Sequence, residues 1–176
     1  MRAFVAIEIS KEIKAEIFKI QNLLKTVGLE AKWVKPENIH LTVAFLGSID
    51  DRQAAAIKEI LTPASQFIEK PINLQLGQIS AFPSASRARV IFLDLSGETE
   101  KAKTSAAQIR SELKKKKIWF DEKSFVPHLT FARLKKPQNL SSLIEKVPIE
   151  KISFEVKEFS LYQSRLSPSG SIYTKL

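Results

Sequence analysis

The stretches His40-Leu41-Thr42-Val43 and His128-Leu129-Thr130-Phe131 decide how this sequence is interpreted. They contain the only two histidines of the 176-residue chain, and both follow a His-x-Thr pattern with apolar residues between and after. In a β-strand, residues two apart share a face, so His and Thr project together while their apolar neighbours point the other way. Polar side chains within otherwise buried strands are costly unless they line a solvated cleft or are fully hydrogen-bonded. We therefore predict two strands that face one cleft.

The spacing of the two histidines predicts two similar lobes. They lie 88 residues apart (128 − 40), which is half of the chain length. A pseudo-twofold axis would then place one His-x-Thr strand on each side of a bound group. Because the ordinary histidine pKa is about 6.5, a facing pair serves as general base and general acid near neutral pH. In-line displacement at phosphorus requires that geometry, with the threonine hydroxyls donating to the phosphoryl oxygens.

Two other interpretations of the histidines stay open at this point. A histidine in a strand is often a hydrogen-bonded structural residue, although two copies of one motif argue against that explanation for both. A two-histidine metal site would need a third protein ligand, and no compact cluster of Asp, Glu or His stands beside either motif. The absence of cysteine removes disulfides, thiolate metal sites and cysteine nucleophiles. We expect neither a metal nor any other cofactor.

Composition indicates a single folded domain over residues 1–176 with a basic surface. The 28 Lys and Arg residues outnumber the 19 acidic residues, giving a formal charge of +9. This excess favours polyanionic partners, with nucleic acid first, although a lysine-rich surface that only keeps the protein soluble is the alternative. The sequence has neither an apolar run long enough to span a membrane nor a signal peptide at its start. We expect a cytoplasmic monomer.

Hydrophobic periodicity predicts a mixed α+β chain with antiparallel hairpins. Strands are expected over residues 2–9, 31–34, 39–46, 72–82, 88–95, 125–134, 152–166 and 171–176. Helices are expected over residues 10–28, from 50 or 51 to the region of Pro63, over 98–117 and over 140–147. Ser10 is the expected N-cap of the first helix, and Gly28 its expected C-terminal cap.

An ordered set of segments, beyond the two motifs, is similar to one known family. The segments are Arg2-Ala3-Phe4-Val5-Ala6-Ile7, Trp33-Val34, Asn38-Ile39 before His40, Phe82-Pro83, Arg89-Val90-Ile91-Phe92, Phe125-Val126-Pro127 before His128, Ala132-Arg133, Leu161-Tyr162-Gln163-Ser164 and Gly170-Ser171-Ile172-Tyr173. Together with the motifs they extend over most of the chain. The sequence resembles the two-histidine (2H) phosphoesterase superfamily and, within it, the RNA 2′,3′-cyclic phosphodiesterase family, which is also described as 2′-5′ RNA ligase-like.

The resemblance implies a bilobal α+β fold in which two antiparallel β-sheets, related by a pseudo-twofold axis, form a central cleft with the helices outside. It implies metal-independent hydrolysis of RNA 2′,3′-cyclic phosphate ends to 2′-phosphomonoesters, with 2′-5′ ligation in some members. Carried over by position, His40 is the proton donor to the leaving 3′-oxygen and His128 the proton acceptor that activates water. Thr42 and Thr130 hold phosphoryl oxygens. A pseudo-symmetric site also permits the opposite division of roles, since reversal of the reaction exchanges acid and base.

The resemblance also assigns Arg133 to the phosphate. A regular strand would place Arg133, five residues after His128, on the opposite face, so a bulge or the end of the strand must redirect it. Arg89 lies beside a predicted loop and is a second candidate for contacting phosphate. The aromatic candidates for stacking a base are Trp33, Phe45, Phe82 and Phe125.

Two rival functions use the same residues. One is a related 2H activity on a small cyclic nucleotide phosphate, and the other is a non-catalytic RNA-binding module. The intact His and Thr of both motifs argue against the binding module, because pure binding needs no paired proton carriers. The net charge favours RNA over the small substrate.

Overall fold

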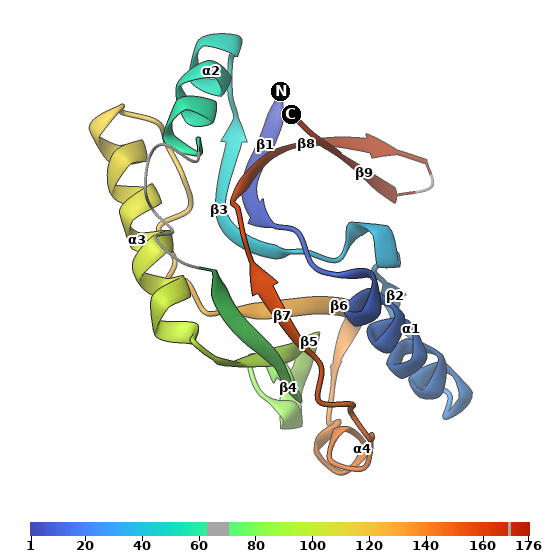
Figure 1. Cartoon of the computed structure of the whole chain (residues 1–176). Coiled ribbons are helices and arrows are strands. Elements are labelled where there is room, and N and C mark those ends of the chain that lie inside the picture. Colours follow the sequence, from blue (N-terminus) through green and yellow to red (C-terminus); the bar gives the residue numbers. More distant parts are fainter. Residues whose placement is uncertain (63–70, 169) are drawn as a thin grey trace.

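The computed structural model describes residues 1–62, 71–168 and 170–176. These residues form two antiparallel sheets with helices on the outside (Figure 1). The strands are β1 (Arg2–Ile7), β2 (Lys32–Trp33), β3 (Leu41–Ser48), β4 (Ile72–Phe82), β5 (Ala88–Gly97), β6 (His128–Gln138), β7 (Ser153–Val156), β8 (Ser160–Ser167) and β9 (Gly170–Lys175). The helices are α1 (Lys11–Thr26), α2 (Asp51–Ile60), α3 (Thr99–Lys115) and α4 (Ser141–Ile144). Short 3-10 turns lie at Pro36–Asn38 and Ala85–Arg87. Pro63, expected near the end of α2, lies outside the described residues.

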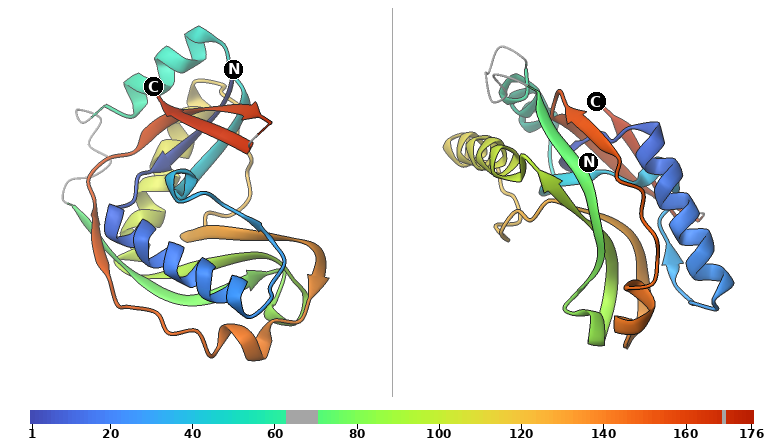
Figure 2. Two further views of the ribbon diagram at one scale, coloured as in Figure 1. Left: turned by 90° about the vertical axis from the view of Figure 1, so that its right-hand side faces the viewer. Right: turned by 60° about the horizontal axis from the view of Figure 1, so that its bottom comes forward.

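The two sheets have the strand orders β3-β1-β8-β9 and β2-β6-β5-β4-β7. In each sheet a strand, a helix and a returning antiparallel partner form one unit: β1-α1-β3 in the first and β5-α3-β6 in the second. The predicted bilobal α+β fold with two antiparallel sheets and external helices is therefore confirmed. Helix α1 lies on one side of the molecule, and α2 and α3 lie on the other (Figures 1 and 2).

Each long helix crosses toward the sheet of the other unit. Helix α1 contacts β6 of the other sheet, and α3 contacts β3 of the other sheet as well as β4 of its own. The helices bury regularly spaced apolar side chains, namely Ile13, Ile17, Ile20 and Leu24 of α1 and Ala102, Ala106, Ile109 and Leu113 of α3. Burial of each isoleucine or leucine contributes about 1.5–3 kcal/mol, so these faces hold the helices against the sheets. Ser10 caps α1 as predicted, because its hydroxyl accepts from the Ile13 amide at 3.4 Å.

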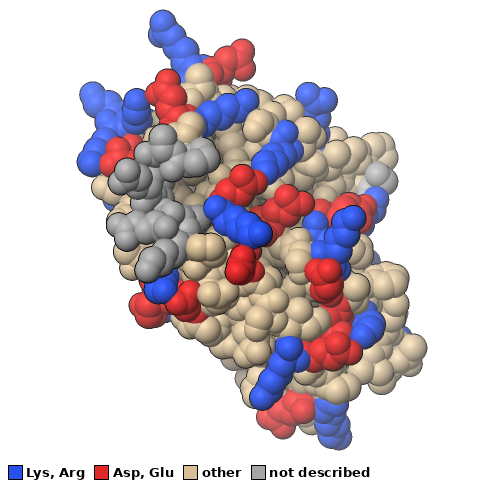
Figure 3. Space-filling view, in the orientation of Figure 1, with Lys and Arg blue, Asp and Glu red and all other residues tan. Residues whose placement is uncertain are grey.

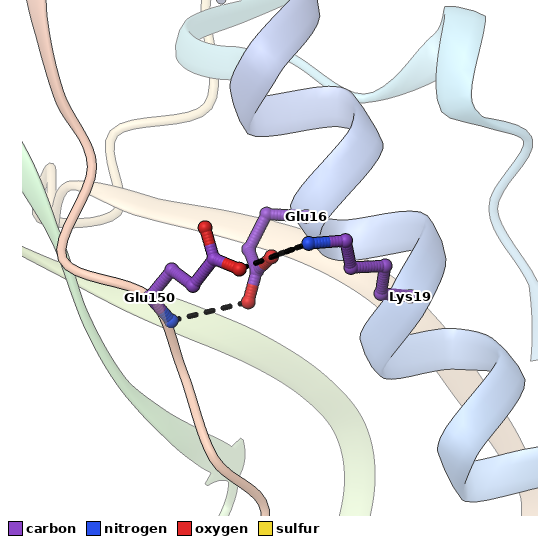
Figure 4. Close-up of polar contacts among 3 residues, drawn as sticks. All are labelled: Glu16, Lys19 and Glu150. Atoms are coloured by element: carbon purple, nitrogen blue, oxygen red, sulfur yellow. Dashed lines mark hydrogen bonds and ion pairs between the residues drawn. The ribbon is translucent and has the colours of Figure 1, made fainter.

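A charged contact joins α1 to the segment before β7 (Figure 4). One carboxylate oxygen of the buried Glu16 accepts from the backbone N–H of Glu150 at 3.1 Å. The other oxygen lies 3.3 Å from Lys19 Nζ, which also donates to the Glu150 side chain at 2.9 Å. A buried carboxylate is tolerated only when it is compensated in this way. The contact therefore holds the segment between α4 and β7 against α1.

Two predicted strand assignments were wrong in their boundaries. The single strand expected over residues 152–166 is two strands, β7 beside β4 and β8 beside β1, in different sheets. The chain leaves one sheet and enters the other over residues 157–159, which period-two patterning does not reveal. The strand expected over residues 125–134 begins only at His128, since Pro127 has no N–H for a ladder hydrogen bond, and it continues to Gln138. Within the described ranges, no helix has the length and apolar character needed to span a membrane.

Candidate active site

The two His-x-Thr motifs meet at one cavity of about 630 Å³. His40 directly precedes β3, and His128 is the first residue of β6, so both lie where their strands begin. His40, Thr42, His128 and Thr130 all line this cavity, and Arg133 lines it with them. The structure therefore brings together five of the six site residues that the sequence predicted.

A β-bulge follows each motif at the same position. In the first sheet, Ala6 pairs with Thr42 but Val5 pairs with Ala44, which leaves Val43 as the extra residue. A bulge inserts one residue into a strand and reverses the alternation of faces beyond it. The fifth residue after His40, which is Phe45, consequently lines the same cavity as the histidine.

The second motif repeats this arrangement. Phe92 pairs with Thr130 and Ile91 pairs with Ala132, so Phe131 is the extra residue. Of the two alternatives expected before Arg133, a bulge or the end of the strand, the structure has the bulge, and Arg133 lines the cavity. The two lobes differ at the fifth residue after the histidine, which is Phe45 in the first lobe and Arg133 in the second.

Arg89 is not brought to this site. Its neighbour Val90 pairs with Arg133, and Phe92 pairs with Thr130, so these β5 residues share the face of the second motif. The register between β5 and β6 shifts between Ala88 and Val90, and Arg89 is not among the described residues that line the cavity. The sequence indicated an arginine beside a loop but not whether that arginine reaches the cavity.

Both imidazoles are fixed through the same ring atom. His40 Nδ1 lies 2.6 Å from the carbonyl oxygen of Asn38, and His128 Nδ1 lies 2.6 Å from that of Val126. Because a carbonyl can only accept, the Nδ1 atoms carry protons that they donate to these oxygens. The remaining ring atom, Nε2, is left on each histidine for proton transfer.

Aromatic rings surround His40 and account for its unusual titration. The Phe4 ring stacks on the imidazole with centroids 4.6 Å apart, and Tyr173 packs edge-on at 5.1 Å. Burial lowers the pKa of His40 from 6.5 to about 4, and electrostatic interactions with Lys14 and His128 act in the same direction. The hydrogen bond to Asn38 opposes this shift without cancelling it. His40 is therefore neutral at pH 7 in the free protein.

The charged residues of the cavity give it a positive balance. Its described lining includes Arg110, Lys123 and Arg133 against the single carboxylate of Asp121. Sequence reasoning missed Arg110, which reaches the cavity from α3 and lies far along the chain from both motifs. A larger groove of about 760 Å³ runs along β4 and the segment after α4, but it contains neither histidine. The cavity between the motifs is therefore the candidate active site.

The fold and this site together define a class of protein. A bilobal α+β chain that presents one His-x-Thr motif from each lobe to a shared cleft is a 2H phosphoesterase. The chain belongs to the LigT-like phosphoesterase family, whose model matches residues 7–92 and again residues 93–173. The two matches divide the chain into the same halves as the two motifs.

Similar proteins extend over almost the whole chain. The RNA 2′,3′-cyclic phosphodiesterase of Methanocaldococcus jannaschii is 35% identical, with 98% of this chain and 96% of that protein covered. The protein of the same name from Methanothermobacter thermautotrophicus is 31% identical, with 100% and 96% covered. A crystal structure of a Thermus thermophilus protein matches with a TM-score of 0.82 and 27% identity over 100% of this chain and 95% of that one. The structure of E. coli LigT complexed with 3′-AMP matches with a TM-score of 0.75 and 25% identity, with 99% and 94% covered.

Proposed function

We propose that this protein hydrolyses RNA 2′,3′-cyclic phosphate ends to 2′-phosphomonoesters, using His40 and His128 as a metal-independent acid and base pair. The observation that carries the proposal is the paired arrangement of the imidazoles, each held through Nδ1 at the edge of one shared cavity. The names of the full-length relatives support the same substrate. The 2′-5′ ligation of RNA is the reverse type of reaction at such a site and is proposed as a secondary activity.

The proposed reaction is an in-line displacement at phosphorus. His128 Nε2 accepts a proton from water as the water oxygen bonds to phosphorus. The bond from phosphorus to the 3′-oxygen breaks, and His40 Nε2 donates its proton to that oxygen. The hydroxyls of Thr42 and Thr130 donate to the non-bridging oxygens, where negative charge increases in the transition state. The product is a 2′-phosphomonoester with a free 3′-hydroxyl.

The depressed pKa of His40 means that this residue can be the proton donor only if it gains a proton before the reaction. A proton donor must be protonated, and burial keeps His40 neutral at pH 7 in the free protein. The anionic cyclic phosphate supplies the opposite charge that raises the pKa of a nearby histidine. We therefore propose that His40 takes up its proton as the substrate binds, with Arg133 pairing with a phosphate oxygen.

RNA is favoured as the substrate by charge and by exposed rings. The excess charge of the chain is positive, although Lys and Arg are interspersed with Asp and Glu over one face of the molecule (Figure 3). The cavity lining itself carries three cationic residues and one acidic residue. Phe45 and Phe82 line the cavity and keep exposed ring surface, which suits stacking of a terminal base. Trp33 instead lies beneath Lys25, with Nζ 5.3 Å from its ring.

The proposed reaction is tested with EDTA-treated protein and a short RNA that ends in a 2′,3′-cyclic phosphate. We expect complete conversion to the 2′-phosphate without added metal, read by mass spectrometry and by resistance of the product to a 3′-specific phosphatase. A 3′-phosphate product would contradict the assignment of the 3′-oxygen as leaving group. Unchanged RNA together with turnover of a small cyclic nucleotide phosphate would support the second candidate function instead.

Arg133→Ala is expected to raise KM for the cyclic phosphate RNA about tenfold or more. Hydrogen bonds to charged groups contribute about 1.5–3 kcal/mol, and 1.4 kcal/mol corresponds to a factor of ten. The measurement is steady-state kinetics at fixed ionic strength. Arg165→Ala is the matched control, because it removes the same charge from an exposed position on β8 that does not line the cavity. Equal losses in the two variants would show that only net charge matters.

A further inference from the structure

Helix α1 carries a buried polar side chain that joins the two lobes. Gln21 is only 1% exposed, and its Nε2 donates to the carbonyl oxygen of Val34 at 2.7 Å and to that of Phe131 at 2.9 Å. Val34 belongs to the segment that leads into His40. Phe131 is the bulge residue directly after Thr130. Gln21 therefore connects the approach to one motif with the bulge of the other.

Helix α3 carries the counterpart with the lobes exchanged. Arg110 donates through Nη1 to the carbonyl oxygen of Lys123 at 2.8 Å. It donates to that of Val43 through Nε at 3.1 Å and Nη2 at 2.8 Å. Lys123 belongs to the segment that leads into His128, and Val43 is the bulge residue directly after Thr42. Arg110 therefore connects the approach to the second motif with the bulge of the first.

Backbone hydrogen bonds also join the lobes near these side-chain contacts. The amide of Val34 donates to Phe131 O at 2.9 Å, and the amide of Asp121 donates to Phe45 O at 2.9 Å. We propose that Gln21 and Arg110 are reciprocal positioning residues, which hold the two histidine motifs at the separation that the reaction needs. This inference rests on the proposed function of the same site. Neither side chain needs to touch the reacting atoms for this role.

The chemistry of the two side chains suits this task. A bulge removes carbonyl groups from the regular strand ladder, so these oxygens need other donors. A carboxamide and a guanidinium both present two or more N–H groups in a fixed geometry, which allows one side chain to hold two carbonyls at a set distance. The two contacts differ in strength, since the guanidinium is charged and also lies 5.6 Å from the Phe120 ring centroid. Arg110 is therefore expected to matter more than Gln21.

The inference is tested with the variants Arg110→Ala, Arg110→Lys and Gln21→Met in the full chain. Displacement of a reacting group by about 1 Å costs on the order of 100-fold in rate, so we expect a kcat loss of about that size for Arg110→Ala. Losses of about tenfold are expected for Arg110→Lys, whose single ammonium cannot reproduce the fork, and for Gln21→Met, which keeps the volume but has no donor. KM should stay within about threefold for Gln21→Met and Arg110→Lys, because both variants keep the charge of the cavity lining, whereas Arg110→Ala also removes one of its three cationic residues.

Each variant has a matched control one helical turn further along its helix. Lys25 on α1 lies over the Trp33 ring, and Lys114 on α3 lies 5.8 Å from the Phe120 ring centroid. These two lysines therefore contact the segments that lead into His40 and His128, as Gln21 and Arg110 do. Neither lysine donates to a bulge carbonyl, whereas Gln21 and Arg110 do. Lys25→Ala and Lys114→Ala should keep kcat within about twofold of the original protein. Thermal unfolding verifies that every variant is folded at the assay temperature.

Two further readouts separate positioning from simple stabilisation. Because the chain has two histidines, its imidazole nitrogen NMR spectrum contains only two sets of ring signals. Both sets should shift in the Arg110 and Gln21 variants and stay unchanged in the two controls. Added guanidinium ion should restore part of the kcat of Arg110→Ala and leave the kcat of Lys114→Ala unaffected.

Folded Arg110→Ala and Gln21→Met variants that keep kcat within threefold and leave both imidazole signals in place would overturn the inference. Equal kcat losses in the lysine controls would also overturn it. If the unaltered protein does not hydrolyse cyclic phosphate RNA, the proposed function fails. The imidazole spectra would still decide whether Gln21 and Arg110 position the histidines, since that comparison needs no substrate.

Discussion

His40→Ala and His128→Ala are each expected to lower kcat for cyclic phosphate RNA by on the order of 10³-fold while RNA affinity changes little. A positioned acid or base contributes about 10²–10⁴ in rate, and the two act in one proton-transfer sequence. Because they act together, the double variant should lose little more than either single variant. The measurements are single-turnover kinetics and binding of an RNA that ends in a 2′-phosphate.

A modified leaving group distinguishes the two histidines. A cyclic substrate with sulfur in place of the 3′-oxygen expels a thiolate, which leaves without being protonated. If His40 is the proton donor, this substrate should restore much of the rate of His40→Ala and little of the rate of His128→Ala. The reverse pattern would exchange the roles of the two residues. Parallel loss of binding and turnover in folded variants would contradict a proton-transfer role for either.

Acidification from pH 6.5 to 4 is expected to cost the native protein about 3 kcal/mol of stability through His40 alone. The unfolded chain protonates this residue below its ordinary pKa of 6.5, whereas burial holds the pKa of folded His40 at about 4. The unfolded state therefore binds more protons across this window, so stability rises with pH within it and is lost as pH falls. Each pKa unit corresponds to about 1.4 kcal/mol, and the contribution no longer changes below pH 4.

The comparison that isolates this effect uses His40→Gln, which cannot titrate. Urea unfolding at pH 4, 5.5 and 7 should give a shallower pH dependence for His40→Gln, because the carboxylates that titrate in the same range are common to both proteins. Inorganic phosphate should recover part of the loss in the unaltered protein, since it favours protonated His40 in the cleft. Identical pH slopes for the two proteins would show that His40 is not held neutral by the fold.

Local features of this protein follow from the sequence with little ambiguity. Alternating apolar residues predicted β1, β4 and β5, and Ser10 with the isoleucine repeat after it predicted α1, because these patterns reflect the period of a single element. The His-x-Thr motif predicted the cleft because its two polar side chains share one face of a strand, and its duplication predicted the two lobes. The sequence also indicated that either a bulge or the end of the strand must precede Arg133, and the structure shows the bulge.

The sequence did not reveal which residues meet across the two halves. The division of residues 152–166 between β7 and β8, the position of Arg89 outside the cavity lining and the depressed pKa of His40 all depend on neighbours that are distant along the chain. The sequence holds only a weak signal for Gln21 and Arg110, which is that nearly the same number of residues separates them as separates the two histidines.

The amino-acid sequence was enough to predict the element types, the pairing of a histidine with a threonine in each motif, and the twofold repetition of that motif. The folded chain was needed to show that carbonyls hold the Nδ1 atoms, that Phe45 and Arg133 occupy equivalent positions, and that each long helix reaches the bulge of the other lobe. The physical reason is that periodicity records which side of an element is buried, whereas hydrogen bonds and desolvation depend on what closure of the two sheets brings against it.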